Sequence, residues 1–226
     1  MNIKACIFDL DGTLLNTLPD IRYYLNTVLR KYSIPEIDEE KTARFVGEGA
    51  LKLVCRTVAD SGIDVTSDAG KELCERICPE YVALYDANPN YLTAPYEGII
   101  ENLHKLHSAG IRLAVLSNKP DSTVKQLVRL YFGDIFDTVR GALPKVPLKP
   151  DPSSALDICR ELSVMPSEVA YFGDTATDIE TGLSLGAKKT VGVLWGFRSR
   201  SELVGAGADA VIDTTDKIYS EILGEQ

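Results

Sequence analysis

The chain has 226 residues, of which 45% are hydrophobic and 25% are charged, a balance that is ordinary for a globular protein. Its 33 acidic residues outnumber its 24 basic residues and give a formal net charge of −9, which argues against nucleic acid or an anionic membrane as the main partner. The sequence shows no apolar run of the ~18 residues that a transmembrane helix needs, and its first residues do not form a signal peptide.

The cysteine content points to a reducing compartment. There are five cysteines, an odd number, and none of them forms a Cys-x-x-Cys pair. Cys74 and Cys78 are one helical turn apart, a spacing that suits a metal, but no second pair completes such a site. We therefore expect reduced thiols in a cytoplasmic protein.

A short apolar run close to the amino terminus ends in two carboxylates. Residues 5–8 are apolar without alternation, which is typical of a buried parallel strand, and the chain continues as Asp9-Leu10-Asp11-Gly12-Thr13. Because side chains alternate along a strand, Asp9 and Asp11 point to the same side at its carboxyl end. Two like charges this close are costly unless a cation or a proton lies between them. The pair predicts a divalent metal ion, a raised carboxyl pKa, or both; the alternative is a strand end capped in a solvated turn.

The next segment is helical, and the rest of the chain alternates between helix and strand. We expect helices at 18–31, 38–46, 50–61 and 68–86. Further helices at 98–108, 121–131, 152–162 and 176–185 alternate with strands at 111–116, 136–140, 168–173 and 189–194, before a strand near 210–212 and a terminal helix.

This order of elements predicts the α/β class, with a Rossmann-like, doubly wound parallel sheet core and an inserted all-helical cap domain. We assign residues 1–15 and 91–226 to the core and residues 16–90 to the cap. Two short linkers, near 15–18 and 87–95, join the two parts.

Three more polar motifs follow predicted strands or lie between them. Ser117-Asn118 follows the strand at 111–116, and Gly173-Asp174 with Asp178 follows the strand at 168–173. Between them, Lys149 lies in a proline-rich loop, Lys149-Pro150-Asp151-Pro152. Each motif alone has an ordinary explanation as a helix cap, a turn or a solvated lysine. Their joint occurrence at the carboxyl edge of one sheet is much more specific.

In this combination the chain resembles the haloacid dehalogenase-like superfamily of phosphohydrolases, and within it the helical-cap branch that contains the phosphoglycolate phosphatases. The resemblance rests on Asp9-Leu10-Asp11-Gly12-Thr13, Ser117-Asn118, Lys149 with its Pro-Asp-Pro, and Gly173-Asp174 with Asp178. It implies a Mg2+-dependent phosphomonoesterase that acts on a small phosphorylated metabolite through an aspartyl-phosphate. It also implies a monomer or homodimer with no nucleic acid or membrane partner.

The resemblance also implies roles for these residues. Asp9 is the expected nucleophile, Asp11 the general acid and base, and Lys149 the residue that holds negative charge on the phosphoryl group. Asp9, Asp174 and the backbone carbonyl of Asp11 are the expected metal ligands. Ser117, Asn118 and Thr13 are the expected phosphate-binding residues, and Asp178 is expected to orient a metal-bound water or Lys149.

Substrate choice is expected to lie in the cap. The segment Val46-Gly47-Glu48-Gly49-Ala50 resembles the loop that family members lower onto the leaving group, so Gly47 and Glu48 are candidate substrate contacts; the alternative is an ordinary turn between helices. An inward-facing Glu48 would repel a small anionic acid such as glycolate, unless Lys52 and Arg56 offset its charge.

Several alternatives stay open. Lys145 precedes Lys149 by four residues and is a second candidate for the catalytic lysine. Trp195 lines the site or packs at the domain junction. A sugar phosphomutase similar to β-phosphoglucomutase, a pyrophosphatase, and a non-catalytic phosphate-binding protein are alternative functions of the same scaffold.

Overall fold

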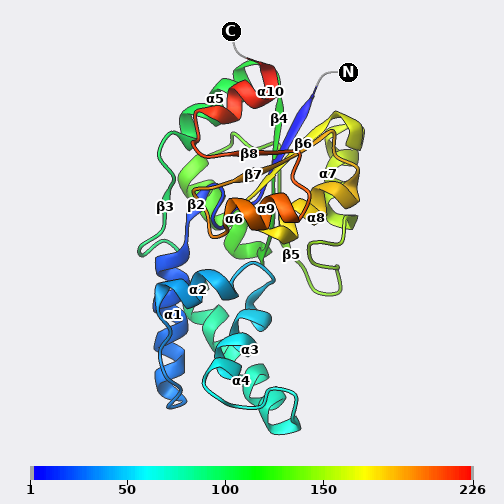
Figure 1. Ribbon diagram of the computed structural model, residues 1–226. Coiled ribbons are helices and arrows are strands. Elements are labelled where there is room, and N and C mark those ends of the chain that lie inside the picture. Colours follow the sequence, from blue (N-terminus) through cyan, green and yellow to red (C-terminus); the bar gives the residue numbers. More distant parts are fainter. Residues whose placement is uncertain (1–2, 225–226) are drawn as a thin grey trace. The chain divides into compact units, whose positions relative to one another are not determined.

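The computed structural model describes residues 3–224 and divides into two compact units (Figure 1). One unit contains the residues up to Asn16 and those from Ala94 onward, and the other contains Thr17–Thr93. An antiparallel ribbon of β2 (Leu15–Asn16) and β3 (Ala94–Pro95) belongs to the first unit. Because these two-residue strands leave no sequence pattern, the sequence places the boundaries at residues 15 and 91, whereas the structure places them at 16 and 94.

The first unit is built on a six-stranded sheet in the order β5-β4-β1-β6-β7-β8, and every neighbouring pair is parallel. The strands are β1 (Ala5–Phe8), β4 (Arg112–Pro120), β5 (Thr138–Ala142), β6 (Val169–Gly173), β7 (Lys189–Val193) and β8 (Ala210–Ile212). This confirms the predicted doubly wound α/β fold. Strand β1 has β4 on one side and β6 on the other, so the order of the strands reverses at β1. The carboxyl ends of the strands at such a reversal form the usual ligand crevice.

Helices cover both faces of this sheet (Figure 1). Cys6 and Phe8 pack into one hydrophobic cluster, whereas Ala5 and Ile7 pack into the other, so β1 is buried on both faces and its sequence does not alternate. The first cluster includes α5 (Ile99–Ser108), α6 (Asp121–Phe132) and α10 (Lys217–Leu223), and the second includes α7 (Ser153–Leu162) and α8 (Ala176–Leu185).

The second unit is all-helical. Its helices are α1 (Leu18–Lys31), α2 (Glu39–Phe45), α3 (Ala50–Asp60) and α4 (Asp68–Ala87), each within one residue of the predicted bounds. The side chains of Asp38 and Ser67 cap α2 and α4 by accepting hydrogen bonds from backbone N–H groups. Within the described part of the chain, every helix is too short or too polar to span a membrane.

Some short elements were not predicted. These are the 3₁₀ turn η1 (Pro166–Glu168), helix α9 (Arg200–Gly205) and the β2–β3 ribbon. Strand β4 also continues past the predicted end at residue 116, with a register shift between Leu116 and Pro120. Ser117, Asn118 and Lys119 therefore lie at the carboxyl end of β4, directly before α6.

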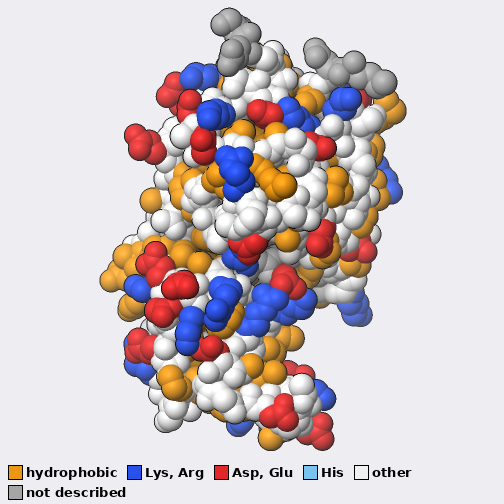
Figure 2. Space-filling view, in the orientation of Figure 1, with side chains coloured by type: hydrophobic (Ala, Val, Ile, Leu, Met, Phe, Trp, Pro, Cys, Tyr) orange, Lys and Arg blue, Asp and Glu red, His pale blue; other side chains and the backbone are white. Residues whose placement is uncertain are grey.

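Acidic and basic side chains are interspersed on the face shown in Figure 2. Many of them form exposed ion pairs, such as Arg30 with Glu36 and Arg129 with Asp134. Pairs of this kind add at most about 1 kcal/mol each to stability.

The buried carboxylate of Asp20 is expected to stabilise the helical unit strongly. Its two oxygens accept hydrogen bonds from Leu92 N at 2.8 Å, Thr93 N at 2.9 Å and Thr93 Oγ1 at 2.7 Å. Asp20→Ala leaves these donors without their acceptor, so we expect a loss of about 1–3 kcal/mol in the free energy of unfolding. Chemical denaturation measures it, with the exposed Glu36→Ala as the control; equal effects of the two substitutions would contradict the assignment.

Candidate active site

Lys149 lies between two carboxylates at the carboxyl edge of the sheet. Its Nζ is 2.8 Å from Asp9 Oδ1, at the end of β1, and 2.6 Å from Asp178 Oδ1, in the first turn of α8. All three side chains are buried, with exposed fractions of 3% for Lys149, 10% for Asp9 and 1% for Asp178. Ion pairs from which water is excluded are much stronger than surface pairs. Lys145, the alternative lysine, is exposed.

Asp174 follows β6 and is fixed by two donors. Thr13 Oγ1 lies 3.2 Å from Asp174 Oδ1, and Phe197 N donates to Asp174 Oδ2 at 2.8 Å. Two glycines leave room for this carboxylate: a Cβ at Gly12 would lie 2.3 Å from Asp174 Oδ2, and one at Gly196 would lie 2.3 Å from Asp174 Cβ. The glycine of the Asp-x-Asp-Gly motif is therefore required for space as well as for its φ of +82°.

Asp178 has a second task besides its ion pair. Its Oδ2 accepts hydrogen bonds from Thr175 N at 3.1 Å and Thr175 Oγ1 at 2.7 Å, which caps the first turn of α8. Its Oδ1 remains for Lys149. The predicted role of Asp178 in orienting Lys149 agrees with these contacts.

The amide of Asn118 holds the loop that carries Lys149. Its Oδ1 accepts from Lys149 N at 2.8 Å, and its Nδ2 donates to Lys149 O at 3.1 Å. The side chain is thus used for structure, and the predicted donation from the backbone N–H of Asn118 to phosphate stays a prediction. Ser117 is buried beside it, and its Oγ accepts from Lys119 N at 3.2 Å, so the hydroxyl proton is available to an acceptor in the site.

Thr13 supports the carboxylate of Asp174, because its buried hydroxyl donates to Asp174 Oδ1. Its predicted contact with phosphate stays a prediction. Trp195 donates from Nε1 to Thr13 O at 2.9 Å and packs on the hydrophobic cluster of the sheet, so the indole anchors the loop after β1.

One residue of the site was missed by the sequence reasoning. Lys119 Nζ lies 3.0 Å from Asp11 Oδ1 and 3.3 Å from Asp11 Oδ2. The side chains are 7% and 15% exposed. The available signal was its position directly after Ser117-Asn118, at the end of the same strand.

Burial and nearby charges shift the pKa values of the carboxyl groups and of the lysine in this site. Burial and the neighbouring charge of Asp178 raise the pKa of Asp9 from 3.8 to about 7, against the opposing effect of Lys149. Burial, Asp178 and Asp9 likewise raise the pKa of Asp174 well above its usual value. Burial acts against the charge of Lys149, but Asp178 and Asp9 outweigh it and raise the pKa of the ammonium group.

The donor set fits a small, hard divalent cation. Asp9, Asp174 and Asp178 each offer an oxygen, and these oxygens lie within 4.8 Å of one another; among residues 3–224 this is the one such cluster of three acidic, histidine or cysteine side chains. Four carboxylates, including that of Asp11, face two ammonium groups, which leaves a formal charge of −2. One divalent cation neutralises this charge, and carboxylate oxygens are the ligands that Mg2+ prefers.

Gly47 and Glu48 belong to the helical unit, and their contact with substrate stays a prediction. Within that unit Glu48 forms ion pairs with Lys52, at 2.5 Å, and with Arg56. The hydrogen bond from Lys52 is the main cause that lowers the pKa of Glu48. The two cations therefore offset the negative charge of Glu48, as the sequence suggested.

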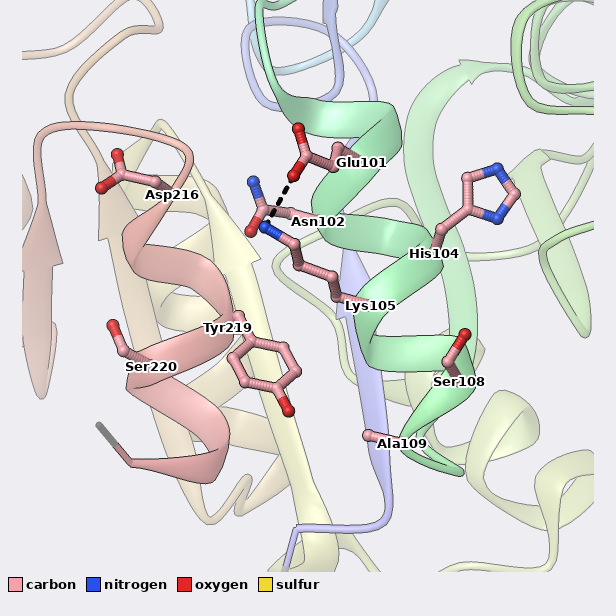
Figure 3. A pocket seen from close by; sticks show the side chains of 9 residues that line it. All are labelled: Glu101, Asn102, His104, Lys105, Ser108, Ala109, Asp216, Tyr219 and Ser220. Atoms are coloured by element: carbon pink, nitrogen blue, oxygen red, sulfur yellow. Dashed lines mark ion pairs between the residues drawn. The ribbon is translucent and has the colours of Figure 1, made fainter. Parts of the chain in front are cut away.

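A groove of about 680 Å³ lies elsewhere on the sheet unit, between α5 and α10 (Figure 3). Lys105 and Tyr219 lie on its two sides, and the charge of Lys105 is paired with Glu101 at 2.8 Å. None of the residues that line it belongs to the acidic cluster, so we place the candidate active site at the cluster.

Comparison with known proteins agrees with this geometry. Residues 6–193 match the family described as haloacid dehalogenase-like hydrolase. The chain belongs to this family. It is 34% identical to the phosphoglycolate phosphatase of Rhodospirillum rubrum over 93% of this chain and 87% of that protein, and 31% identical to the N-acetylmuramic acid 6-phosphate phosphatase of Pseudomonas aeruginosa over 94% and 92%. A solved structure from Lactobacillus delbrueckii, a candidate phosphoglycolate phosphatase, superimposes with a TM-score of 0.93 and 29% identity over all of both chains.

Gly12→Ala is expected to disturb Asp174 beyond the cost of backbone strain. Gly110 is a matched control, because it has the same φ of +82° and a Cβ there meets nothing within 4 Å. We expect Gly110→Ala to cost about 1–2 kcal/mol of unfolding free energy and Gly12→Ala clearly more. Thermal and chemical denaturation of the two variants measure these losses. Equal losses of unfolding free energy in Gly12→Ala and Gly110→Ala would show that Asp174 does not need this space.

The protein without bound metal should lose stability as pH rises from about 4 to above 7. The pKa of Asp9 is higher in the folded than in the unfolded chain, so folding binds protons in this window, and the gain present below pH 4 disappears as pH rises through 7. Asp9→Asn should reduce the fall of the unfolding free energy with pH, and the raised pKa of Asp174 should account for the fall that remains. Urea unfolding at several pH values in EDTA measures it; a stability that increases across the window would contradict the assignment.

Proposed function

We propose that this chain, a phosphatase of the haloacid dehalogenase-like family, hydrolyses phosphomonoesters of a small metabolite with Mg2+ and an aspartyl-phosphate on Asp9. The observation that carries the proposal is the buried group of Asp9, Lys149, Asp178 and Asp174 at the sheet reversal, with Asp11 beside it. Such a group is unfavourable without a cation, and a bound Mg2+ ion would supply the positive charge that also attracts a phosphate ester.

In the first half of the reaction, Asp9 attacks phosphorus. A bond forms between a carboxylate oxygen of Asp9 and phosphorus while the bond to the leaving oxygen breaks. Asp11 gives its proton to that oxygen, which leaves as an alcohol. Lys149 lies 2.8 Å from Asp9 Oδ1, where its charge reduces the repulsion between the nucleophile and the phosphoryl oxygens.

In the second half, water attacks the phosphorus of the aspartyl-phosphate and restores Asp9. Asp11 takes a proton from that water, so the acid of the first half becomes the base of the second. The hydroxyl of Ser117 and the backbone N–H of Asn118 would donate to the phosphoryl oxygens in both halves.

Asp9, Asp174 and the backbone carbonyl of Asp11 would hold the magnesium ion, and Asp178 would act through Lys149. When bound, the ion supplies positive charge that stabilises the negative charge developing on the phosphoryl oxygens. The raised pKa values of Asp9 and Asp174 in the metal-free protein support this assignment.

Phosphoglycolate is the first candidate substrate. Two of the relatives are named for phosphorylated acids, phosphoglycolate and N-acetylmuramic acid 6-phosphate. The pairing of Glu48 with Lys52 and Arg56 removes the objection that this carboxylate would repel an acidic leaving group. We further propose a cytoplasmic monomer or homodimer that needs no nucleic acid or membrane partner.

Phosphate release from a panel of phosphorylated metabolites tests the proposed function. We expect turnover with Mg2+, no turnover with EDTA, and phosphoglycolate among the best substrates. Asp9→Asn should abolish turnover while the circular dichroism spectrum remains that of the wild type, because the substitution removes the nucleophile and leaves the side-chain volume unchanged.

Two results would contradict the proposal. Equal rates with Mg2+ and with EDTA would remove the metal from the mechanism. An isomerised sugar phosphate without release of inorganic phosphate would favour the phosphomutase instead.

A further inference from the structure

Lys119 is a second buried lysine in the site, and the proposed mechanism does not use it. Its ammonium group contacts both oxygens of Asp11, at 3.0 and 3.3 Å, and its side chain is 7% exposed. A charge this well buried is costly unless its partner is fixed and close. The buried Lys119 therefore fixes the position of the Asp11 carboxyl group, which an exposed lysine at the same strand end would not do.

We propose that Lys119 is a positioning residue, which holds the carboxyl group of Asp11 where it exchanges protons with the leaving oxygen and with water. This inference rests on the proposed function. Asp11 is two residues from Asp9, and Asp174 and Asp178 lie in the same cluster as Asp9. Whenever Asp11 is ionised, as it is after it has given up its proton and before it takes one from water, these negative charges repel it, and the ammonium group of Lys119 opposes its displacement.

The backbone around Lys119 is suited to this task. Lys119 N donates to Ser117 Oγ at 3.2 Å, and the register of β4 shifts between Leu116 and Pro120. The residue is held on the strand that neighbours β1, so the ammonium group reaches Asp11 from the adjacent strand end. Side chains on rigid strand ends position partners more precisely than side chains on loops.

Positioning predicts a dependence on the leaving group. An alkyl leaving group needs the proton that Asp11 delivers when its bond to phosphorus breaks, whereas a nitrophenolate leaves as a stable anion without one. A displaced Asp11 should therefore slow alkyl phosphates much more than p-nitrophenyl phosphate. The constant kcat/KM reports the steps up to the first bond cleavage, so it isolates this effect from the later hydrolysis.

The experiment measures kcat/KM for 2-phosphoglycolate and for p-nitrophenyl phosphate at saturating Mg2+. The variants are Lys119→Met, Lys119→Arg, Asp11→Asn and the double variant Lys119→Met with Asp11→Asn. Lys125→Met is the matched control, because Lys125 also pairs with an aspartate, Asp121, but is 58% exposed.

We expect Lys119→Met to lower kcat/KM for 2-phosphoglycolate by about 100-fold. The loss for p-nitrophenyl phosphate should be at least about tenfold smaller, since little proton transfer is needed. Lys119→Arg should recover part of the loss, and Lys125→Met should match the wild type. In the Asp11→Asn background, Lys119→Met should have no further effect on either substrate, because the carboxylate that it positions is gone.

Three results would overturn the inference. The first is an equal loss with both substrates, and the second is a further loss from Lys119→Met when Asp11 is already asparagine. The third is a change in the Mg2+ concentration that gives half-maximal rate, which would mean that Lys119 acts through the metal. If the wild type hydrolyses neither these substrates nor any ester of the metabolite panel, the proposed function fails and this inference fails with it. If the wild type is active and Asp11→Asn discriminates between leaving groups, only the role of Lys119 is in question.

Discussion

The ion pairs that Lys149 makes with Asp9 and Asp178 are the interaction on which the site depends. Burial disfavours each of these charges alone, and only their mutual contact at 2.6–2.8 Å makes the group tolerable inside the protein. The compensation is incomplete, because burial and like charges still raise the pKa of Asp9 to about 7 and also raise that of Asp174 well above its usual value. The remaining negative charge is what prepares the site to bind a divalent cation and, with it, a phosphate ester.

The scaffold supports these charges with neutral groups. The amide of Asn118 fixes the backbone of Lys149, the hydroxyl of Thr175 fixes Asp178, and the backbone N–H of Phe197 fixes Asp174. Each group comes from a strand end or from the loop that follows it, at the point where the strand order reverses around β1. A parallel sheet with this order therefore brings the site together from segments far apart in the sequence.

The sequence predicts the parts of this site that leave a local pattern. The apolar run before Asp9 indicates a buried strand, and the proline context of Lys149 separates it from Lys145, which is exposed. Contacts between residues far apart in the sequence leave no such pattern. The hydrogen bond of Thr13 with Asp174 joins residues 161 positions apart, and the contact of Lys119 with Asp11 joins residues 108 positions apart. A hydroxyl or an ammonium group fits several partners equally well, so only the folded arrangement decides which one it takes. The β2–β3 ribbon was missed because two-residue strands are too short to show a period.

The central claim is that the phosphoryl group passes through Asp9. Rapid quenching of the enzyme during turnover, followed by mass spectrometry of its peptides, tests this most directly. With p-nitrophenyl phosphate, whose leaving group needs no proton, we expect one added phosphoryl group on the peptide that contains Asp9, more of it in Asp11→Asn than in the wild type, and none in Asp9→Asn. Phosphate release without any such adduct, or an adduct on a different residue, would contradict it.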